Sequence, residues 1–246
     1  APTHRGRSGR LHRYCDSPIL GVSVRQIARL AQSGELTVTR TVGGVLLLDG
    51  ASVHRLAKHG RRNGRPWSPA TAWAALALLS DVHADWLDAS AMSRLRHRLR
   101  ACNASELGWM TRRRAMVHRM RGWGKTQGLL HTGVSALRDP GMSELFDLAA
   151  VESGADGYVR ARDFAGLMTT LGLVDDSDGD VTVRVVPDDA GYAVDHVLTA
   201  AVAVDLAESL DTRESAAGMR VLDDLLDAFR SDRTQPRRRE SRQLIR

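Results

Sequence analysis

The length and composition of the chain limit its fold class. It has 246 residues, of which 43% are hydrophobic and 26% are charged, so it can bury a sizeable core and is not disordered throughout. The longest apolar run, residues 72–79, is too short to span a membrane, and no signal peptide opens the sequence. We therefore expect a cytoplasmic protein without membrane contact. The two cysteines, Cys15 and Cys102, lack zinc-ligand spacing and are expected to be free thiols.

The net charge of +6 is the sum of two very different halves. Residues 1–140 contain 23 Lys and Arg against 8 Asp and Glu, a net charge of +15, and residues 141–246 contain 12 against 21, a net charge of −9. A basic half of this kind indicates binding to a polyanion. We expect the acidic half to have a different role, such as forming a homodimer or binding a partner protein.

Taken in order, the chain begins with an Arg- and His-rich stretch, residues 1–13, that predicts a disordered basic arm. The first predicted helix covers residues 24–32, with Ser23 as its N-cap. Ile27 and Leu30 share its apolar face. The opposite face presents two arginines and a glutamine, the side chains that recognise guanine and adenine in the major groove: Arg25, Gln26 and Arg29.

A predicted hairpin follows this helix. Residues 36–39 alternate as a strand, residues 42–44 form a turn, and residues 45–48 return as a more buried strand. Asp49 or Ser52 can then start a short helix that packs Val53 and Leu56 on the same core. Arg40 lies near the tip of the hairpin.

The order Leu-Gly-Val-Ser, helix, Ser-Gly-Glu-Leu, strand, Val-Gly-Gly, strand resembles the winged helix-turn-helix of MerR-type and excisionase-type DNA-binding proteins. The resemblance implies that residues 14–59 form such a domain. Its helix would enter the major groove, and its hairpin would lie along the backbone or minor groove as a wing. The DNA contacts that this domain would supply are Ser23, Arg25, Gln26, Arg29, Thr39, Arg40 and Thr41.

Residues 60–67 form a basic linker whose Gly-Arg-Pro core resembles an AT-hook, although Asn63 stands where the hook has an arginine. We expect Arg61, Arg62 and Arg65 to contact DNA, either in the minor groove or non-specifically on phosphates. Residues 68–127 are predicted to be a basic helical region. Its helices are expected at residues 70–79, at 90–102 and from 105 or 106 to about 121, and Arg112 and Arg113 of the third helix are further candidate DNA contacts.

Residues 128–231 predict an acidic α+β domain, and residues 232–246 a basic tail. The domain is expected to contain a strand and helix at 130–137, strands at 157–159 and 181–186, and helices at 163–173, 194–210 and 212–230. The acidic stretch 175–180 is better explained as a turn than as a calcium loop, because the later ligands are absent. Motifs such as Thr-Gly-Val-Ser-Ala-Leu and Val-Asp-Leu-Ala-Glu-Ser-Leu-Asp make this half similar to the C-terminal half of AbiEi-type antitoxins, which implies a regulatory or dimerising domain and a toxin as partner.

The sequence thus predicts a mainly α fold with small β elements (α+β): an N-terminal winged helix-turn-helix, central basic helices and a C-terminal α+β domain. The predicted function is sequence-specific DNA binding by a nucleoid-associated transcriptional regulator, a repressor or autoregulator. The alternative is an antitoxin or scaffold whose acidic domain binds a partner protein. An enzyme is the rival class, with Asp223, Asp224 and Asp227 as metal ligands, but no catalytic or nucleotide motif appears, so we expect no catalytic residue, metal or cofactor.

Overall fold

The computed structural model describes residues 20, 22–32, 36, 38–42, 45–59, 65–122, 126–150 and 154–231. The predicted basic arm 1–13, the tail 232–246 and the linker arginines Arg61 and Arg62 lie outside these residues. None of the helices within the described ranges is long and apolar enough to cross a membrane.

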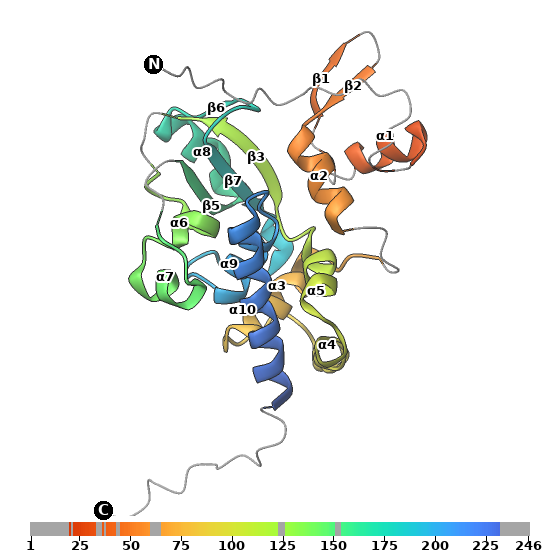
Figure 1. Cartoon of the computed structure of the whole chain (residues 1–246), viewed down its shortest axis with the longest axis vertical. Helices are drawn as coiled ribbons and strands as arrows, with labels where there is room; N and C mark the ends of the chain where they lie inside the picture. The colour runs from red at the N-terminus through yellow and green to blue at the C-terminus, as the bar shows by residue number, and fades with distance from the viewer. Residues whose placement is uncertain are drawn as a thin grey trace, which may run out of the picture.

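The N-terminal part of the chain forms a small unit with a core of its own. It contains helix α1 (Val24–Gln32), an antiparallel hairpin of β1 (Val38–Val42) and β2 (Val45–Leu48), and helix α2 (Gly50–His59) (Figure 1). The residues buried at its centre are Ile27, Leu36, Leu48 and Val53. This core is separate from the larger core formed by residues 67–226.

Local capping contacts explain where the two helices of this unit begin. The Ser23 carbonyl accepts hydrogen bonds from the backbone N–H of Gln26 at 2.9 Å and of Ile27 at 3.0 Å, and the Ser23 hydroxyl lies 3.3 Å from the same Gln26 nitrogen. At α2, the Asp49 carboxylate accepts from the backbone N–H of Ser52 at 2.8 Å. The predicted helix at 24–32 and its N-cap are confirmed, and Asp49 is the residue that starts the next helix.

Three helices follow the linker: α3 (Pro69–Leu79), α4 (Ala89–Ala101) and α5 (Ala104–Thr111). Each begins with a side-chain cap, in the case of α3 the Ser68 hydroxyl, which accepts from the backbone N–H of Thr71. α3 is apolar nearly all round and is buried along most of its length, so it forms the central helix of the larger core.

The third helix predicted for the basic region is wrong beyond Thr111. Residues Met116–Arg121 form strand β3, which pairs antiparallel with residues 181–185. Arginine is a good helix former, but local preference is a weak constraint that pairing with a distant strand readily overrides. The region predicted as basic and helical is therefore helical only as far as α5.

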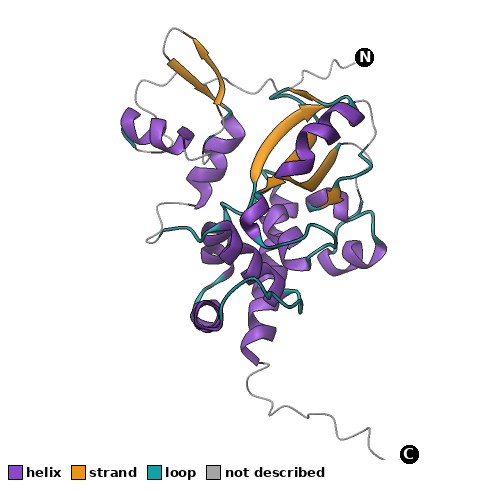
Figure 2. Cartoon of the chain, turned by 180° about the vertical axis from the view of Figure 1, so that it is seen from behind, coloured by secondary structure: helices purple, strands orange, loops and turns teal. Residues whose placement is uncertain are grey.

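A five-stranded mixed sheet lies beside these helices. Its order is β4 (Leu130–His131), β5 (Ala155–Arg160), β7 (Val181–Val186), β3 and β6 (Val174–Asp175). β5 and β7 are parallel and the other pairs antiparallel. Helix α8 (Ala161–Leu171) covers one face of the sheet (Figure 2), where it packs against the odd-numbered valines of β7.

The other face of the sheet meets the C-terminal helices. The short helices α6 (Gly133–Ala136) and α7 (Pro140–Phe146) and a 3-10 turn (Asp188–Ala190) lead to α9 (Thr199–Ala207) and α10 (Thr212–Ser231). A Cβ atom on Gly218 of α10 would lie 2.4 Å from the Ala207 nitrogen, so a glycine is needed where α10 crosses α9. The helix predicted at 194–210 begins only at Thr199, because Val194 has a positive φ of 54°.

The larger core joins elements from both predicted domains. Trp73 of α3, Leu107 of α5, Tyr158 of β5, Val204 of α9 and Leu222 of α10 are buried in the same cluster. The described residues of the predicted basic region 68–127 and acidic domain 128–231 thus share one core instead of forming two. The protein has a mixed α/β fold with a five-stranded sheet, so its β structure is larger than the small elements predicted.

Cys102 illustrates how burial in this core changes side-chain chemistry. Its Sγ lies 3.5 Å from the Leu99 carbonyl at the end of α4, and burial raises the pKa of the thiol from 9.0 to about 11. The thiolate is then about a hundredfold rarer at pH 8, and the greater nucleophilicity of a thiolate with a higher pKa partly offsets this loss.

The reactivity of Cys102 tests its burial. In a Cys15→Ser variant we expect iodoacetamide to alkylate native Cys102 about tenfold more slowly than it alkylates Cys102 in the urea-unfolded chain, as followed by mass spectrometry. Equal rates would contradict the burial of this thiol.

Candidate functional site

Helix α1 packs on the small core through one face and exposes polar side chains on the other. Ile27 is only 2% exposed and holds the helix on its core, whereas Arg25, Gln26 and Arg29 are exposed. Ser23 is also exposed, at the N-terminus of the same helix. The structure therefore brings together the four residues predicted to contact DNA in this segment. Arg25 and Arg29 are one helical turn apart, so their side chains leave the same face.

The hairpin supplies the second part of the predicted interface. Thr39, Arg40 and Thr41 all lie on β1, whose pairing with β2 runs from Val38 opposite Leu48 to Val42 opposite Val45. The register shifts between Val38 and Arg40, and Thr41 is exposed. The hairpin follows α1 directly, and both pack on the same small core, as a wing would.

Three further predicted DNA contacts within the described residues, Arg65, Arg112 and Arg113, do not lie on α1. Arg65 is exposed, two residues before the buried Trp67. Arg112 lies over the ring of Trp109, with its Cζ atom 3.4 Å from the ring centroid, and donates to the Trp109 carbonyl at 2.9 Å. Arg113 is half-buried next to it. Arg112 and Arg113 therefore follow the end of α5 and do not share an element with the α1 surface.

Helix α4 carries a further basic face that the sequence indicates. Leu95 and Leu99 are buried, while the side chains on the outer side of the helix are exposed. These exposed basic side chains are Arg94, Arg96, His97 and Arg98. The Cζ atom of Arg98 lies 5.7 Å from the ring centroid of Trp67, at the point where the linker joins the larger unit. The α4 face could add phosphate contacts without reading bases.

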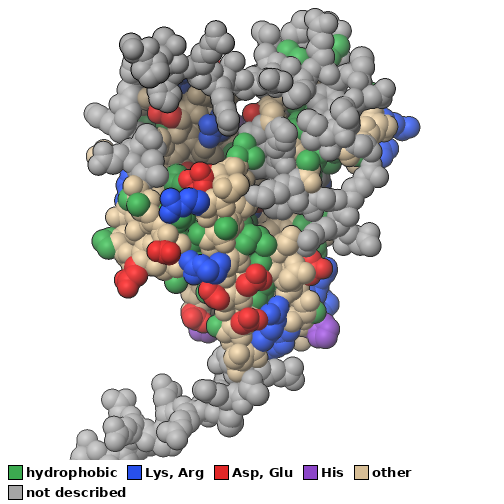
Figure 3. Space-filling model, viewed as in Figure 1, with side chains coloured by type: hydrophobic (Ala, Val, Ile, Leu, Met, Phe, Trp, Pro, Cys, Tyr) green, Lys and Arg blue, Asp and Glu red, His purple; other side chains and the backbone are tan. Residues whose placement is uncertain are grey.

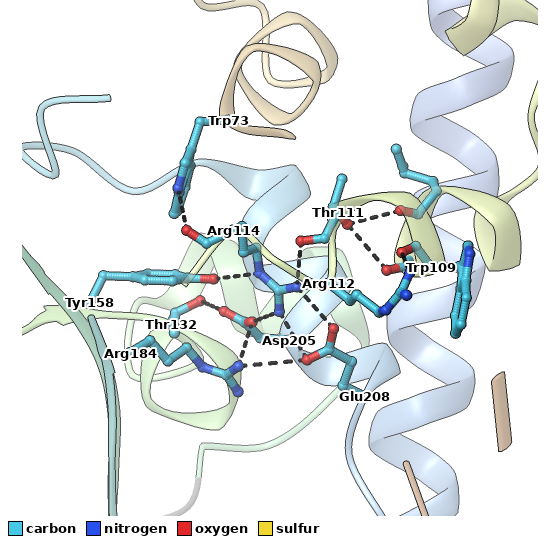
Figure 4. Close-up of polar contacts among 12 residues, drawn as sticks. Trp73, Trp109, Thr111, Arg112, Arg114, Thr132, Tyr158, Arg184, Asp205 and Glu208 are labelled. Carbon is cyan, nitrogen blue, oxygen red and sulfur yellow. Dashed lines mark hydrogen bonds and ion pairs between the residues drawn. The ribbon is translucent and has the colours of Figure 1, made fainter. Parts of the chain in front are cut away.

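A buried ionic network lies between the sheet and α9, centred on Arg114. Its guanidinium donates to the Asp205 carboxylate, to Glu208 at 2.9 and 3.0 Å, and to the Tyr158 hydroxyl at 3.0 Å (Figure 4). The Thr132 hydroxyl donates to the other oxygen of the Asp205 carboxylate. Burial acts to lower the pKa of Arg114, but the neighbouring Glu208 and Asp205 raise it well above its ordinary value. Arg114 therefore stays charged in the interior.

Arg184 of β7 completes the network from the sheet side. It makes a bidentate pair with Asp156 of β5, with distances of 2.7 and 2.8 Å, and its Nη1 lies 3.0 Å from Asp205. Asp205 thus bridges two arginines, and its side chain is 0% exposed. Burial raises the pKa of Asp156, although Arg184 opposes this shift. Three carboxylates and two guanidiniums are held together at this point in the core.

The network borders a cavity of about 410 Å³. β3, β5 and β7 contribute one side of the cavity, and the end of α9 with the start of α10 contributes the other. Gly133 and Gly154 lie at its wall, where a Cβ atom would approach Asp156 Oδ2 to 2.8 Å and the Asp180 carbonyl to 2.7 Å, respectively. Both glycines have positive φ, so other residues would be strained at these positions.

The carboxylates suggested as metal ligands in the rival enzyme class make other contacts. Asp223 accepts from the Ala104 N–H at 3.3 Å, Asp224 lies 3.7 Å from Arg220, and Asp227 accepts from Arg230 at 2.5 Å. Acidic and basic side chains are interspersed over the face that contains α10 (Figure 3). Among the residues that the structure describes, no group of three His, Cys, Asp or Glu side chains could hold a metal ion.

Comparison with known proteins assigns no function to the α1 surface or to the buried network. No protein-family model, curated protein or solved structure matches the chain. The function is therefore argued from the α1 surface, the hairpin, and the buried network with its cavity.

Proposed function

We propose that the protein is a sequence-specific, DNA-binding transcriptional regulator, in the simplest case a repressor that occupies its own promoter. Helix α1 would enter the major groove, and the β1–β2 hairpin would lie along the backbone or minor groove. The observation that supports this most directly is the exposure of Arg25, Gln26 and Arg29 on α1, with Arg25 and Arg29 on the side of the helix opposite the buried Ile27. Arginine and glutamine make bidentate contacts with guanine and adenine, respectively.

The spacing of the two arginines suits neighbouring base pairs. Residues four apart on a helix are separated by about 6 Å along its axis, close to the rise of two base pairs of DNA. Gln26 lies beside Arg25 and could complete a short recognition sequence. The overall charge of +15 in residues 1–140 favours the same partner, because basic side chains release counterions when they meet phosphates.

The assignment of α1 predicts different effects for two exposed arginines. After selection of a binding site from a random duplex pool, Arg29→Ala should lose about 1–3 kcal/mol of discrimination at one base position. Arg65→Ala, in the linker, should weaken binding to every duplex by a similar factor because a phosphate contact has no base preference. Fluorescence anisotropy on a panel of single-base variants measures both effects. Equal losses on all duplexes for both variants would contradict base reading by α1.

A second proposal concerns the acidic half of the chain. Residues 141–246 have a net charge of −9, which favours a role as an antitoxin or scaffold that binds a basic partner protein, with DNA binding used for autoregulation. Co-expression with the product of the adjacent gene tests this proposal. A stoichiometric complex that survives gel filtration and weakens with salt would support it, and separate elution of the two proteins would contradict it.

A further inference from the structure

The basic side chains of the α4 face have no acidic partners in the part of the chain that the structure describes. Helix α4 contains no Asp or Glu, and Arg94 donates to the Ser90 hydroxyl of the same helix. Within the described residues, Arg94, Arg96 and Arg98 form no ion pair. Exposed arginines on other elements differ, since Arg121 of β3 pairs with Asp176 and Arg220 of α10 lies 3.7 Å from Asp224.

The rest of the sequence does not supply the missing negative charge. The residues outside the described ranges contain 13 Lys and Arg against 5 Asp and Glu, so on balance they add positive charge. The α4 face is also fixed in place, because Leu95 and Leu99 are buried in the larger core. A fixed surface with this excess of positive charge attracts an anionic partner.

The composition of the α4 face favours DNA over other anionic partners. Helix α4 lies wholly within the described residues, and none of its large apolar side chains is among the exposed ones. A helix bound to a membrane inserts apolar side chains, and a protein interface has an apolar centre, so a purely basic face suits neither. Contacts with DNA phosphates require only basic side chains and N–H donors.

The α4 face lies beside the end of the linker that comes from the small N-terminal unit. The Cζ atom of Arg98 is 5.7 Å from the ring centroid of Trp67, and the Trp67 backbone N–H donates to the Met110 carbonyl at 2.9 Å. Helix α2 ends at His59, and the chain from there to Arg65 can cover at most about 21 Å. One turn of duplex DNA is longer, about 34 Å. A duplex that is bound by the small unit and extends beyond it can therefore also meet the α4 face.

We propose that the α4 face binds the phosphate backbone of duplex DNA that flanks the sequence read by α1. This inference rests on the proposed function, because it assigns a second surface to the same DNA partner. Phosphate contacts carry no base preference, so the α4 face would add affinity for any sequence, and α1 would supply the discrimination. The protein would then contact more DNA than the bases that α1 reads.

The salt dependence of DNA binding by the intact protein tests this inference. Fluorescence anisotropy is measured on the selected duplex with about 10 flanking base pairs on each side, about one helical turn, and on a shuffled duplex of equal length. In Arg94→Gln/Arg98→Gln, the slope of log affinity against log salt concentration should become shallower by about 1.8, because each phosphate contact contributes about 0.9. Discrimination between the two duplexes should stay unchanged.

Two matched variants show whether position and charge cause the effect. Arg162→Gln/Arg213→Gln removes two exposed arginines from α8 and α10 and should keep the slope of the unaltered protein. Arg94→Lys/Arg98→Lys keeps both charges on α4 and should also keep that slope. Arg94 and Arg98 are exposed, so their variants should fold, which circular dichroism checks.

The outcomes separate this inference from the proposed function. An unchanged slope in Arg94→Gln/Arg98→Gln, in a protein that still discriminates between the duplexes, would overturn the inference and leave the proposed function intact. A shallower slope in a protein that binds both duplexes equally would support the α4 face and contradict base reading by α1. An equal loss of slope in Arg162→Gln/Arg213→Gln would overturn the inference, because binding would then follow net charge alone. Absence of DNA binding by the unaltered protein would overturn both.

Discussion

Replacement of Arg114 by Met should lower the free energy of unfolding by about 3–5 kcal/mol, because it leaves buried carboxylates without their partner. Arg114 is 2% exposed and contacts Asp205 and Glu208, and the Asp205 side chain is completely buried. Arg184 would remain beside Asp205 at 3.0 Å, but it is already paired with Asp156. Methionine fills a similar volume, so the loss reports mainly the missing charge and hydrogen bonds.

Urea unfolding followed by circular dichroism measures this loss. Arg121→Met is the matched control, because Arg121 is 59% exposed and pairs with Asp176 at the surface, where an ion pair contributes about 1 kcal/mol or less. The double variant Arg114→Met/Glu208→Met should lose less than the sum of the two single losses, since both side chains belong to one network. A loss below about 1 kcal/mol for Arg114→Met would contradict the importance of the network.

Trp73→Ala is the second substitution with a large expected effect, a loss of about 3–5 kcal/mol of stability. Trp73 is 0% exposed and stacks on Tyr192 with 4.2 Å between ring centroids; it also makes a T-shaped contact with Tyr158, with 5.0 Å between ring centroids. Its indole N–H donates to the Arg114 carbonyl at 2.9 Å, so the side chain joins the core to the network. Removal of the ring would leave a cavity at this junction.

The comparison with Trp73→Phe separates the two contributions of this side chain. Phenylalanine keeps an aromatic ring in the core but cannot donate to the Arg114 carbonyl, so we expect a smaller loss of about 1–3 kcal/mol. Urea unfolding with near-ultraviolet circular dichroism follows both variants. Losses under 1 kcal/mol for Trp73→Ala would mean that the residue is not central to the core.

Local signals in the sequence were sufficient for many of the elements. Ser68 followed by Pro69 predicts the start of α3, and Ser23 predicts the start of α1, because both caps depend on residues within one turn. The alternation of residues 181–186 predicts β7 with its observed bounds. Such elements could be predicted because the interactions that define their ends lie within a few residues.

Strand β3 and the ionic network depend on distant contacts and could not be predicted in this way. Arg119 of β3 reaches Thr182, 63 residues later in the chain, and Arg114 reaches Asp205, 91 residues later. The sequence does contain a signal for the network: Asp205 is the only charged residue of α9, and Arg184 the only one of β7. A single charge within an apolar element indicates a buried partner, but it does not identify that partner.

The candidate DNA interface is predictable only in part for the same reason. Ser23, Arg25, Gln26 and Arg29 share one helix, so its periodicity alone places them on one surface. Arg112 and Arg113 were expected to lie within a long basic helix. Helix α5 ends at Thr111, so both residues follow the helix instead. The base contacts and the role of the linker arginines Arg61 and Arg62 stay predictions.

The most direct test of the central proposal is the affinity of the intact protein for its selected duplex and for a shuffled duplex of the same composition. Fluorescence anisotropy at several salt concentrations measures both affinities. Reading of bases by α1 predicts binding to the selected duplex that is about a thousandfold tighter or more. Similar affinities for both duplexes, falling steeply together as salt rises, would show only a polyanion-binding surface and would contradict sequence-specific recognition.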